Sequence, residues 1–302
     1  MLEVCLLGTG GMMPKRDRYL ASAYLRYQGA GLLIDCGEAT QLAFKACGYA
    51  FKQIGILCIT HFHADHISGL PGLLLSMGNE GRTEPLRIFG PRGLTRVVNA
   101  LRIIAPELPF AVECTELEER EETWQVGDYQ LTAFRLRHNV PCCGYTVRIH
   151  RAGKFQPERA RENGVPMQIW GALQKQPTAT LDGVTYTAEQ VLGAPRRGFH
   201  VTYTTDTRPL PIIVEQAADA DLFICEGTYT DEEKREKAEQ VGHMTFAEAA
   251  GLAARAKPRR FWLTHFSPAV VDPTEGLPTA QAIWADTVCG TDGMQIDLPF
   301  DE

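Results

Sequence analysis

The run at 60–66, Thr-His-Phe-His-Ala-Asp-His, holds the residue types in this 302-residue chain that are best suited to chemistry. It follows an apolar segment that reads as a buried strand, so His61 and His63 leave the strand two positions apart and point the same way. Asp65 and His66 come where the chain must turn. One ion rarely takes four ligands from so short a loop. We therefore expect His61 and His63 to bind one ion and Asp65 and His66 to face a second, which predicts a dinuclear metal site.

Three further ligand candidates each follow a predicted strand. His138 comes after the segment 131–137, Asp206 after 201–205 and His265 after 261–264, and functional groups of open α/β sheets gather where strands end. We therefore predict one ion on His61, His63 and His138, a second ion on Asp65, His66 and His265, and Asp206 as the bridge. Nitrogen and oxygen ligands favour two zinc ions, with manganese or iron as alternatives.

Two divalent ions about 3.5–4 Å apart can turn a bridging water into hydroxide and hold the oxygens of a phosphodiester. Cleavage also needs a proton for the departing alkoxide, and His243 is not required by either ligand set. We predict that His243 is the general acid and that Glu226, at the end of the preceding strand, orients it. Asp65, His243 and Glu226 are thus the expected catalytic residues. The alternative for His243 is a residue at the start of a helix that takes no part in the chemistry. The alternative for Glu226 is likewise a carboxylate without a catalytic role.

The composition is that of an ordinary soluble globular protein, with 44% hydrophobic and 22% charged residues. A formal net charge of -7 argues against a surface coated in basic residues for general nucleic-acid binding. No apolar run reaches membrane-spanning length and the chain opens directly into a strand pattern, so we expect a cytosolic protein without a membrane partner. The nine cysteines show no CxxC pair, and even the adjacent Cys142-Cys143 is better read as buried thiols than as soft metal ligands.

The elements that must position these residues repeat one pattern of strands and helices in two halves. Strands are expected at 2–7, twice within 22–35, at 56–60, at 86–90, several times within 112–137, and at 199–204, 221–225 and 260–263. Helices are expected at 39–47, 67–75 (with its own Pro and Gly as interruptions), 92–105, 209–218 and 245–256. His243, two residues before the last of these ranges, is expected to begin a helix. Two such halves predict an α/β protein with a four-layer αββα sandwich.

Residues 152–198 differ from both halves. They contain four prolines and scattered glycines without a long apolar period, so they fit poorly into a central sheet. Six basic residues against four acidic ones give this segment a net charge of +2, which leaves -9 on the rest of the chain. We predict a single domain over 1–302 with an inserted arm at 152–198. The alternative is a flexible loop without a role.

Taken together, these motifs resemble the metallo-β-lactamase superfamily and, within it, the ribonuclease Z family, which matures tRNA 3′ ends. The resemblance covers nearly the whole chain and is carried by the segments 7–11, 34–41, 60–73, 138–145, 206–209 and 264–267. Within the arm, 153–155, 165–166 with 170–173, and 191–196 look like that family's protruding exosite, whereas 167–169 replaces a Gly-Pro-rich stretch of the family. The histidine run by itself indicates only the superfamily, whereas the arm indicates ribonuclease Z.

This resemblance implies a zinc-dependent endoribonuclease on a metallo-β-lactamase fold that removes the 3′ trailer from precursor tRNA through a metal-bridging hydroxide. It implies an arm that grips the tRNA elbow, and a homodimer in which the arm of one subunit serves the site of its partner. The expected substrate-binding residues are Arg16, Arg18, Lys154 and Arg196. The family's P-x-K-x-R-N loop departs here, since Arg16 replaces Lys and Tyr19 replaces Asn. In the family this loop is linked to handling of the tRNA 3′ end.

Other functions fit parts of the pattern. A two-metal phosphodiesterase or other small-substrate hydrolase would share every ligand, but a small substrate gives no reason for a basic insertion. A redox di-iron protein usually has Glu where this chain has His63, and no room remains for a flavin domain. An inactive RNA-binding module would keep the arm and lose ligands, whereas all seven ligand candidates are present.

Overall fold

Two seven-stranded sheets dominate the computed structural model, which describes residues 1–300. The first sheet has the order β16 (Met294–Leu298), β1 (Leu2–Gly8), β2 (Ser22–Tyr27), β3 (Ala30–Ile34), β4 (Ile54–Cys58), β5 (Leu86–Pro91) and β6 (Val112–Leu117). The second has the order β15 (Thr287–Cys289), β14 (Phe261–Thr264), β13 (Leu222–Glu226), β12 (Arg196–Thr204), β9 (Cys143–Arg151), β8 (Tyr129–Arg135) and β7 (Glu121–Val126). Their buried strands are nearly continuous apolar runs, as expected for strands covered on both faces.

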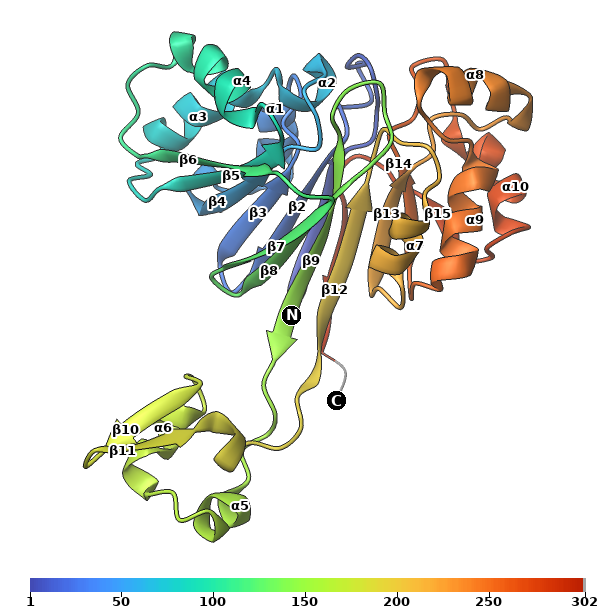
Figure 1. The fold of residues 1–302 in the computed structure, drawn as a ribbon. Coiled ribbons are helices and arrows are strands. Elements are labelled where there is room, and N and C mark those ends of the chain that lie inside the picture. Colours follow the sequence, from blue (N-terminus) through green and yellow to red (C-terminus); the bar gives the residue numbers. More distant parts are fainter. Residues whose placement is uncertain (301–302) are drawn as a thin grey trace. The chain divides into compact units, whose positions relative to one another are not determined.

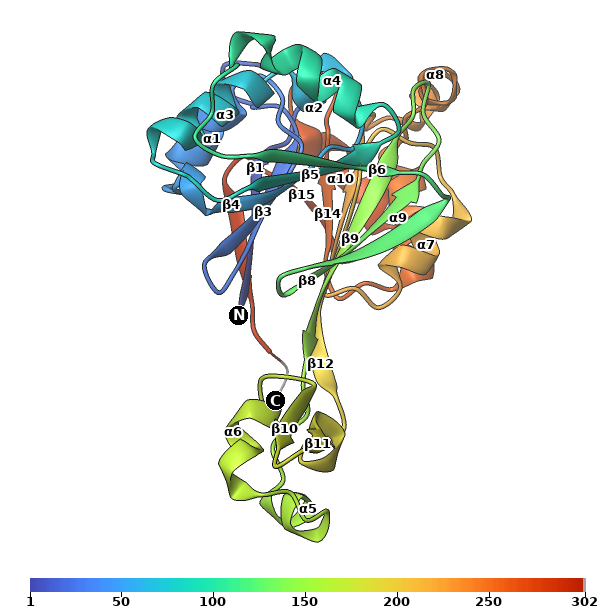
Figure 2. The same cartoon turned by 60° about the vertical axis from the view of Figure 1, so that its left-hand side comes forward.

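Helices cover the outer face of each sheet (Figures 1 and 2). The first sheet carries α1 (Thr40–Ala46), α2 (Ala64–Ile67), α3 (Leu70–Asn79) and α4 (Leu94–Leu101). The second half supplies α7 (Pro211–Ala217), α8 (Arg235–Val241), α9 (Phe246–Ala256) and α10 (Leu277–Gln281). Two separate apolar cores form beneath these helices, one around Phe44 and Leu73 and the other around Phe223 and Phe246. The predicted αββα sandwich is confirmed.

Several element boundaries differ from the sequence-based expectation. Pro71 does not interrupt a helix over 67–75, because α3 begins at Leu70 and the proline occupies its first turn, where no N–H is needed. His243 does not begin α9, which starts at Phe246 behind an N-cap at Thr245. The capping box between Thr245 and Glu248 sets this start. His243 therefore lies in the loop between α8 and α9. The patterns also left α8, α10, β9, β15 and β16 unpredicted.

Parallel pairing brings the ends of distant strands to one edge of each sheet. β3 pairs with β4, and β13 pairs with both β12 and β14, all in parallel. The carboxyl ends of parallel neighbours point the same way, so the residues that follow them come close together. Tyr145 links the two sheets at this level, because its hydroxyl donates to the Ile59 carbonyl at 2.7 Å.

Residues 149–198 form a compact unit of their own with Phe300. Their elements are α5 (Pro157–Glu162), η3 (Met167–Ile169), α6 (Trp170–Leu173), a hairpin of β10 (Thr178–Leu181) and β11 (Val184–Thr187), and η4 (Ala188–Gln190). A small core of Ala160, Val165, Ile169, Leu173 and Val191 holds them together. Each helix is too short to give a long apolar period, and so the sequence pattern showed none.

Within residues 1–300, no helix has both the length and the apolar character to cross a membrane.

Candidate metal centre

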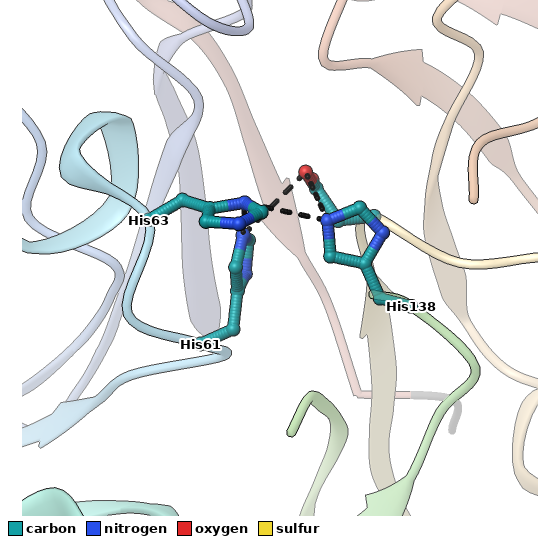
Figure 3. A group of neighbouring side chains, drawn as sticks. His61, His63 and His138 are labelled. Carbon is teal, nitrogen blue, oxygen red and sulfur yellow. Dashed lines mark hydrogen bonds and ion pairs between the residues drawn. The ribbon is translucent and has the colours of Figure 1, made fainter. Parts of the chain in front are cut away.

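Three histidines and one aspartate form the first ligand cluster (Figure 3). His63 Nδ1 lies 3.0 Å from His61 Nε2 and 3.3 Å from His138 Nε2. Asp206 Oδ2 lies 3.6 Å from His61 Nε2 and 3.8 Å from His138 Nε2. The four donor atoms all lie within 4.8 Å of one another, a spacing that suits a single ion held between them.

The second cluster is formed by Asp65, His66 and His265. The Nε2 atoms of His66 and His265 are 3.2 Å apart, and Asp65 Oδ2 lies 3.4 and 3.6 Å from them. Asp206 Oδ1 lies 3.0 Å from His265 Nε2 and 3.4 Å from His66 Nε2. One oxygen of Asp206 therefore faces each cluster. Burial raises the pKa of Asp206, but His265 and His66 outweigh burial and hold it well below its usual range, so the carboxylate is ionised.

In most of these histidines, the ring nitrogen that faces away from the clusters has a polar partner. His66 Nδ1 lies 2.8 Å from Asp35 Oδ2, His138 Nδ1 3.2 Å from the Gly242 carbonyl, and His265 Nδ1 3.3 Å from Thr228 Oγ1. Such outer partners fix the ring and turn the Nε2 lone pair inwards, the usual arrangement around a bound metal. Burial also lowers the pKa values of His61, His63 and His138, which favours the neutral, metal-binding form. The donor set fits two divalent cations.

Three residues of the site have backbones in the left-handed region. Asp35 has φ 60°, Asp206 φ 44° and His265 φ 60°, and each directly follows a strand or comes two residues after one. Such conformations cost about 1–3 kcal/mol for residues other than glycine and persist only where the surroundings enforce them. At His265 the packing is close, because a Cβ on Gly11 would lie 2.6 Å from the His265 ring.

Asp35 also belongs to this site, although the sequence patterns gave it no role. It is fully buried, and it accepts hydrogen bonds from the Thr60 amide at 2.8 Å and from the Thr60 hydroxyl. Together with its contact to His66, these bonds make it the outer partner of the second cluster. A carboxylate directly after the apolar run Leu32–Ile34 was the available signal, since an ionisable group there must find partners.

Asp35→Asn is expected to weaken binding of a divalent ion at the second cluster about 10- to 100-fold, because the amide orients His66 less firmly and makes it a weaker ligand. Titration against a fluorescent chelator measures this affinity. Asp182→Asn, in the exposed turn between β10 and β11, is the matched control and should bind like the parent. Equal affinities for parent and Asp35→Asn would contradict the role of Asp35.

His243 and Glu226 meet beside the clusters. His243 Nδ1 lies 3.3 Å from Glu226, and His243 Nε2 lies 3.9 Å from Asp206 Oδ2. Glu226 is fully buried and accepts from the Thr207 amide at 2.6 Å and the Thr228 hydroxyl at 2.5 Å. Burial lowers the pKa of His243, but the Glu226 carboxylate outweighs it and raises the pKa to about 9. His243 is also close enough to Asp206 and His265 to form a third possible ligand group.

The four predicted substrate-binding residues have different surroundings. The Arg18 guanidinium donates to the Val270 and Val271 carbonyls at 2.9 and 3.1 Å, so its donors fasten the loop of residues 10–20. Arg196 Nε donates to the Ala152 carbonyl at 2.9 Å. Arg16 and Lys154 are exposed. Their contact with a substrate stays a prediction.

The loop that carries Arg16 also touches the metal centre. The Met12 amide donates to Asp65 Oδ2 at 2.7 Å, so this loop helps to hold a predicted ligand.

Cys142 and Cys143 are buried thiols, and burial raises both of their pKa values. They remain protonated and lie outside all three ligand groups found among residues 1–300.

Comparisons with known proteins agree with this geometry. The family described as anti-Pycsar protein Apyc1 matches residues 2–152, and the beta-lactamase superfamily domain matches residues 160–266. A ribonuclease Z of Agathobacter rectalis is 56% identical over 302 residues and covers both chains completely. A ribonuclease Z of Lachnoclostridium phytofermentans is 50% identical over all of this chain and 99% of its own. The crystal structure of the short form of human tRNase Z matches with a TM-score of 0.72 and 25% identity over 99% of this chain and 100% of that one.

Proposed function

Because the chain belongs to the ribonuclease Z family of phosphodiester-cleaving endoribonucleases, we propose that it removes the 3′ trailer from precursor tRNA in the cytosol. The observation that carries this proposal is Asp206, whose two carboxylate oxygens each face a separate group of ligand residues. This arrangement supports a two-metal phosphodiesterase centre, with zinc as the ion that nitrogen and oxygen donors favour.

One ion would be held by His61, His63 and His138, and the other by Asp65, His66 and His265. Asp206 would bind both ions. When bound, two divalent ions would activate a water molecule as the nucleophile and offset the negative charge of the phosphodiester. The protein's residues fix the spacing of the donors and keep the Asp206 carboxylate ionised.

His243 completes the reaction as the general acid. Its Nε2 faces the clusters while Nδ1 contacts Glu226, so the ring is oriented with a proton available on the side of the substrate. Attack at phosphorus breaks the bond to the 3′ oxygen of the last tRNA nucleotide, and that oxygen takes the proton. The tRNA leaves with a 3′-hydroxyl and the trailer keeps a 5′-phosphate.

The unit at 149–198 supports tRNA as the substrate. Its exposed basic side chains are Lys154, Arg159, Arg161, Lys175 and Arg197, and the segment is positive on a chain that is otherwise acidic. Such a surface attracts RNA phosphates, whereas a small phosphodiester would gain little from it. We infer that this unit binds the tRNA body and that the enzyme is a homodimer, as the family resemblance implies.

Glu226→Gln is expected to move the alkaline decline of precursor cleavage to lower pH. The carboxylate raises the pKa of His243, and an acid must stay protonated to act, so losing the carboxylate narrows the active range from its alkaline side. The pH profile of kcat on a precursor tRNA measures the shift. If the alkaline decline in kcat occurred at the same pH in the variant and the parent, Glu226 would not control the pKa of His243.

Cleavage of a precursor tRNA with a 3′ trailer, compared with hydrolysis of bis-p-nitrophenyl phosphate, tests the proposed function. We expect a single cut that leaves a 3′-hydroxyl on the tRNA and a 5′-phosphate on the trailer. Efficient hydrolysis of the small ester with an intact precursor would instead indicate a small-substrate phosphodiesterase.

A further inference from the structure

Arg208 connects the end of β12 to the loop that carries His243. It follows Asp206 by two residues, and it is a buried arginine with 9% of its surface exposed. Its Nη1 donates to the main-chain carbonyl of His243 and, at 2.9 Å, to Glu248 Oε2. Its Nη2 donates to Glu248 Oε1 and, at 3.3 Å, to Glu239. One guanidinium thus holds the His243 main chain and a buried carboxylate at the same time.

Glu248 belongs to the start of α9. It accepts from the Thr245 amide at 3.1 Å, and Thr245 Oγ1 accepts from the Glu248 amide at 3.3 Å. The loop is therefore fixed at its α9 end by the capping box and at the His243 carbonyl by Arg208. Arg208 joins the loop to the segment after β12 that bears Asp206, and the Met244 amide, which donates to Glu226 at 3.1 Å, is a second main-chain anchor of this loop.

The held segment has two tasks at the metal centre. It presents the His243 ring to Glu226, and its Gly242 carbonyl faces His138 Nδ1 at 3.2 Å. The main chain of Arg208 also touches the other side of the site, because its amide donates to the Arg137 carbonyl at 3.1 Å. A shift of this segment would move the proton donor relative to the phosphodiester.

We propose that Arg208 is a positioning residue, which keeps His243 in place to protonate the leaving 3′ oxygen by holding its main-chain carbonyl. This inference rests on the proposed function, in which His243 is the acid. Arginine suits the task because its planar fork donates in fixed directions to several acceptors at once, whereas the ammonium of lysine is a single compact group. Arg235 Nε lies 3.3 Å from Glu248 Oε1, so that carboxylate keeps a cationic partner when Arg208 is replaced.

The leaving group of the substrate separates positioning from general structural support. The 3′ alkoxide of a tRNA needs a proton as it departs, but nitrophenolate is a weak base and leaves without one. Four variants are compared with the parent on precursor tRNA and on bis-p-nitrophenyl phosphate: Arg208→Gln, Arg208→Lys, His243→Asn and the control Glu239→Gln. Glu239 also contacts Arg208 but is largely exposed and lies outside the site.

His243→Asn and Arg208→Gln are each expected to lower kcat on the precursor about 100-fold and to stay within about threefold of the parent on the small ester. Arg208→Lys should show the same selective loss at about tenfold or more, and Glu239→Gln should match the parent on both substrates. Circular dichroism and metal content verify that each variant is folded and loaded.

The outcomes separate two failures. If His243→Asn affects both substrates equally, or neither, the acid role in the proposed function is wrong and the positioning role falls with it. If His243→Asn is selective while the Arg208 variants lose both activities equally, or lose neither, only the inference about Arg208 is wrong. Should Arg208→Gln not fold, Arg208→Lys decides by the same criteria.

Discussion

His63→Ala is expected to lower kcat about 1,000-fold or more on precursor tRNA and on bis-p-nitrophenyl phosphate alike. The Nδ1 atom of His63 sits between His61 and His138 at 3.0 and 3.3 Å, so its loss opens the first cluster on one side. Metal ions contribute several kcal/mol to such reactions, and each 1.4 kcal/mol or so is a factor of ten in rate. Both substrates depend on the same ions, and therefore both should be affected.

Initial rates at saturating divalent ion, together with the metal content of the purified protein, check this expectation. His150→Ala is the matched control on the small ester, because His150 is exposed and lies outside every ligand group found in residues 1–300. If His63→Ala retained more than about a tenth of the parent rate, the first cluster could not be the catalytic metal site.

Deletion of residues 155–195 is expected to lower only the activity on precursor tRNA, unlike His63→Ala. It should lower kcat/KM on precursor tRNA about 100-fold, since the basic side chains that attract phosphates are lost, and leave hydrolysis of the small ester within about twofold. The two ends of the deletion are close together, because the Gly193 amide donates to the Lys154 carbonyl at 2.8 Å. The separate core of this unit also means that its removal takes no side chain from the two sheet cores.

A charge-neutralised arm is the matched control for this deletion. Replacing Lys154, Arg159, Arg161 and Lys175 with Gln keeps the unit and removes exposed cations. It should weaken precursor binding and flatten the salt dependence by about one power of the salt concentration for each lost phosphate contact. Equal loss of tRNA and small-ester activity on deletion would count against a separate substrate-binding unit.

The sequence was sufficient to predict most of the side chains that the fold brings together in the candidate metal centre, because its signals are local. Three histidines and a carboxylate directly after an apolar strand identify the ligand types, and strand ends locate His138, Asp206 and His265. The same periodicity predicted the αββα sandwich. Helix starts were less well predicted, since the capping box at Thr245 decides where α9 begins and leaves His243 in the preceding loop.

The roles that depend on distant partners needed the tertiary structure. His66 and His265 are 199 positions apart in the chain, and their Nε2 atoms are 3.2 Å apart in the fold. Periodicity describes neighbours within one element, so it is silent on which nitrogen of a ring points inwards or which buried carboxylate orients it. Asp35 and Arg208 went unassigned for this reason.

The amino-acid sequence by itself therefore determined the chemistry available to this protein: the ligand types, their positions after strands and a basic segment within an acidic chain. Only the tertiary structure decided that the two oxygens of Asp206 face different clusters and that Arg208 holds His243 from the end of β12. The physical reason is that parallel pairing within each sheet, and packing between the sheets, bring together the ends of strands that are far apart along the chain.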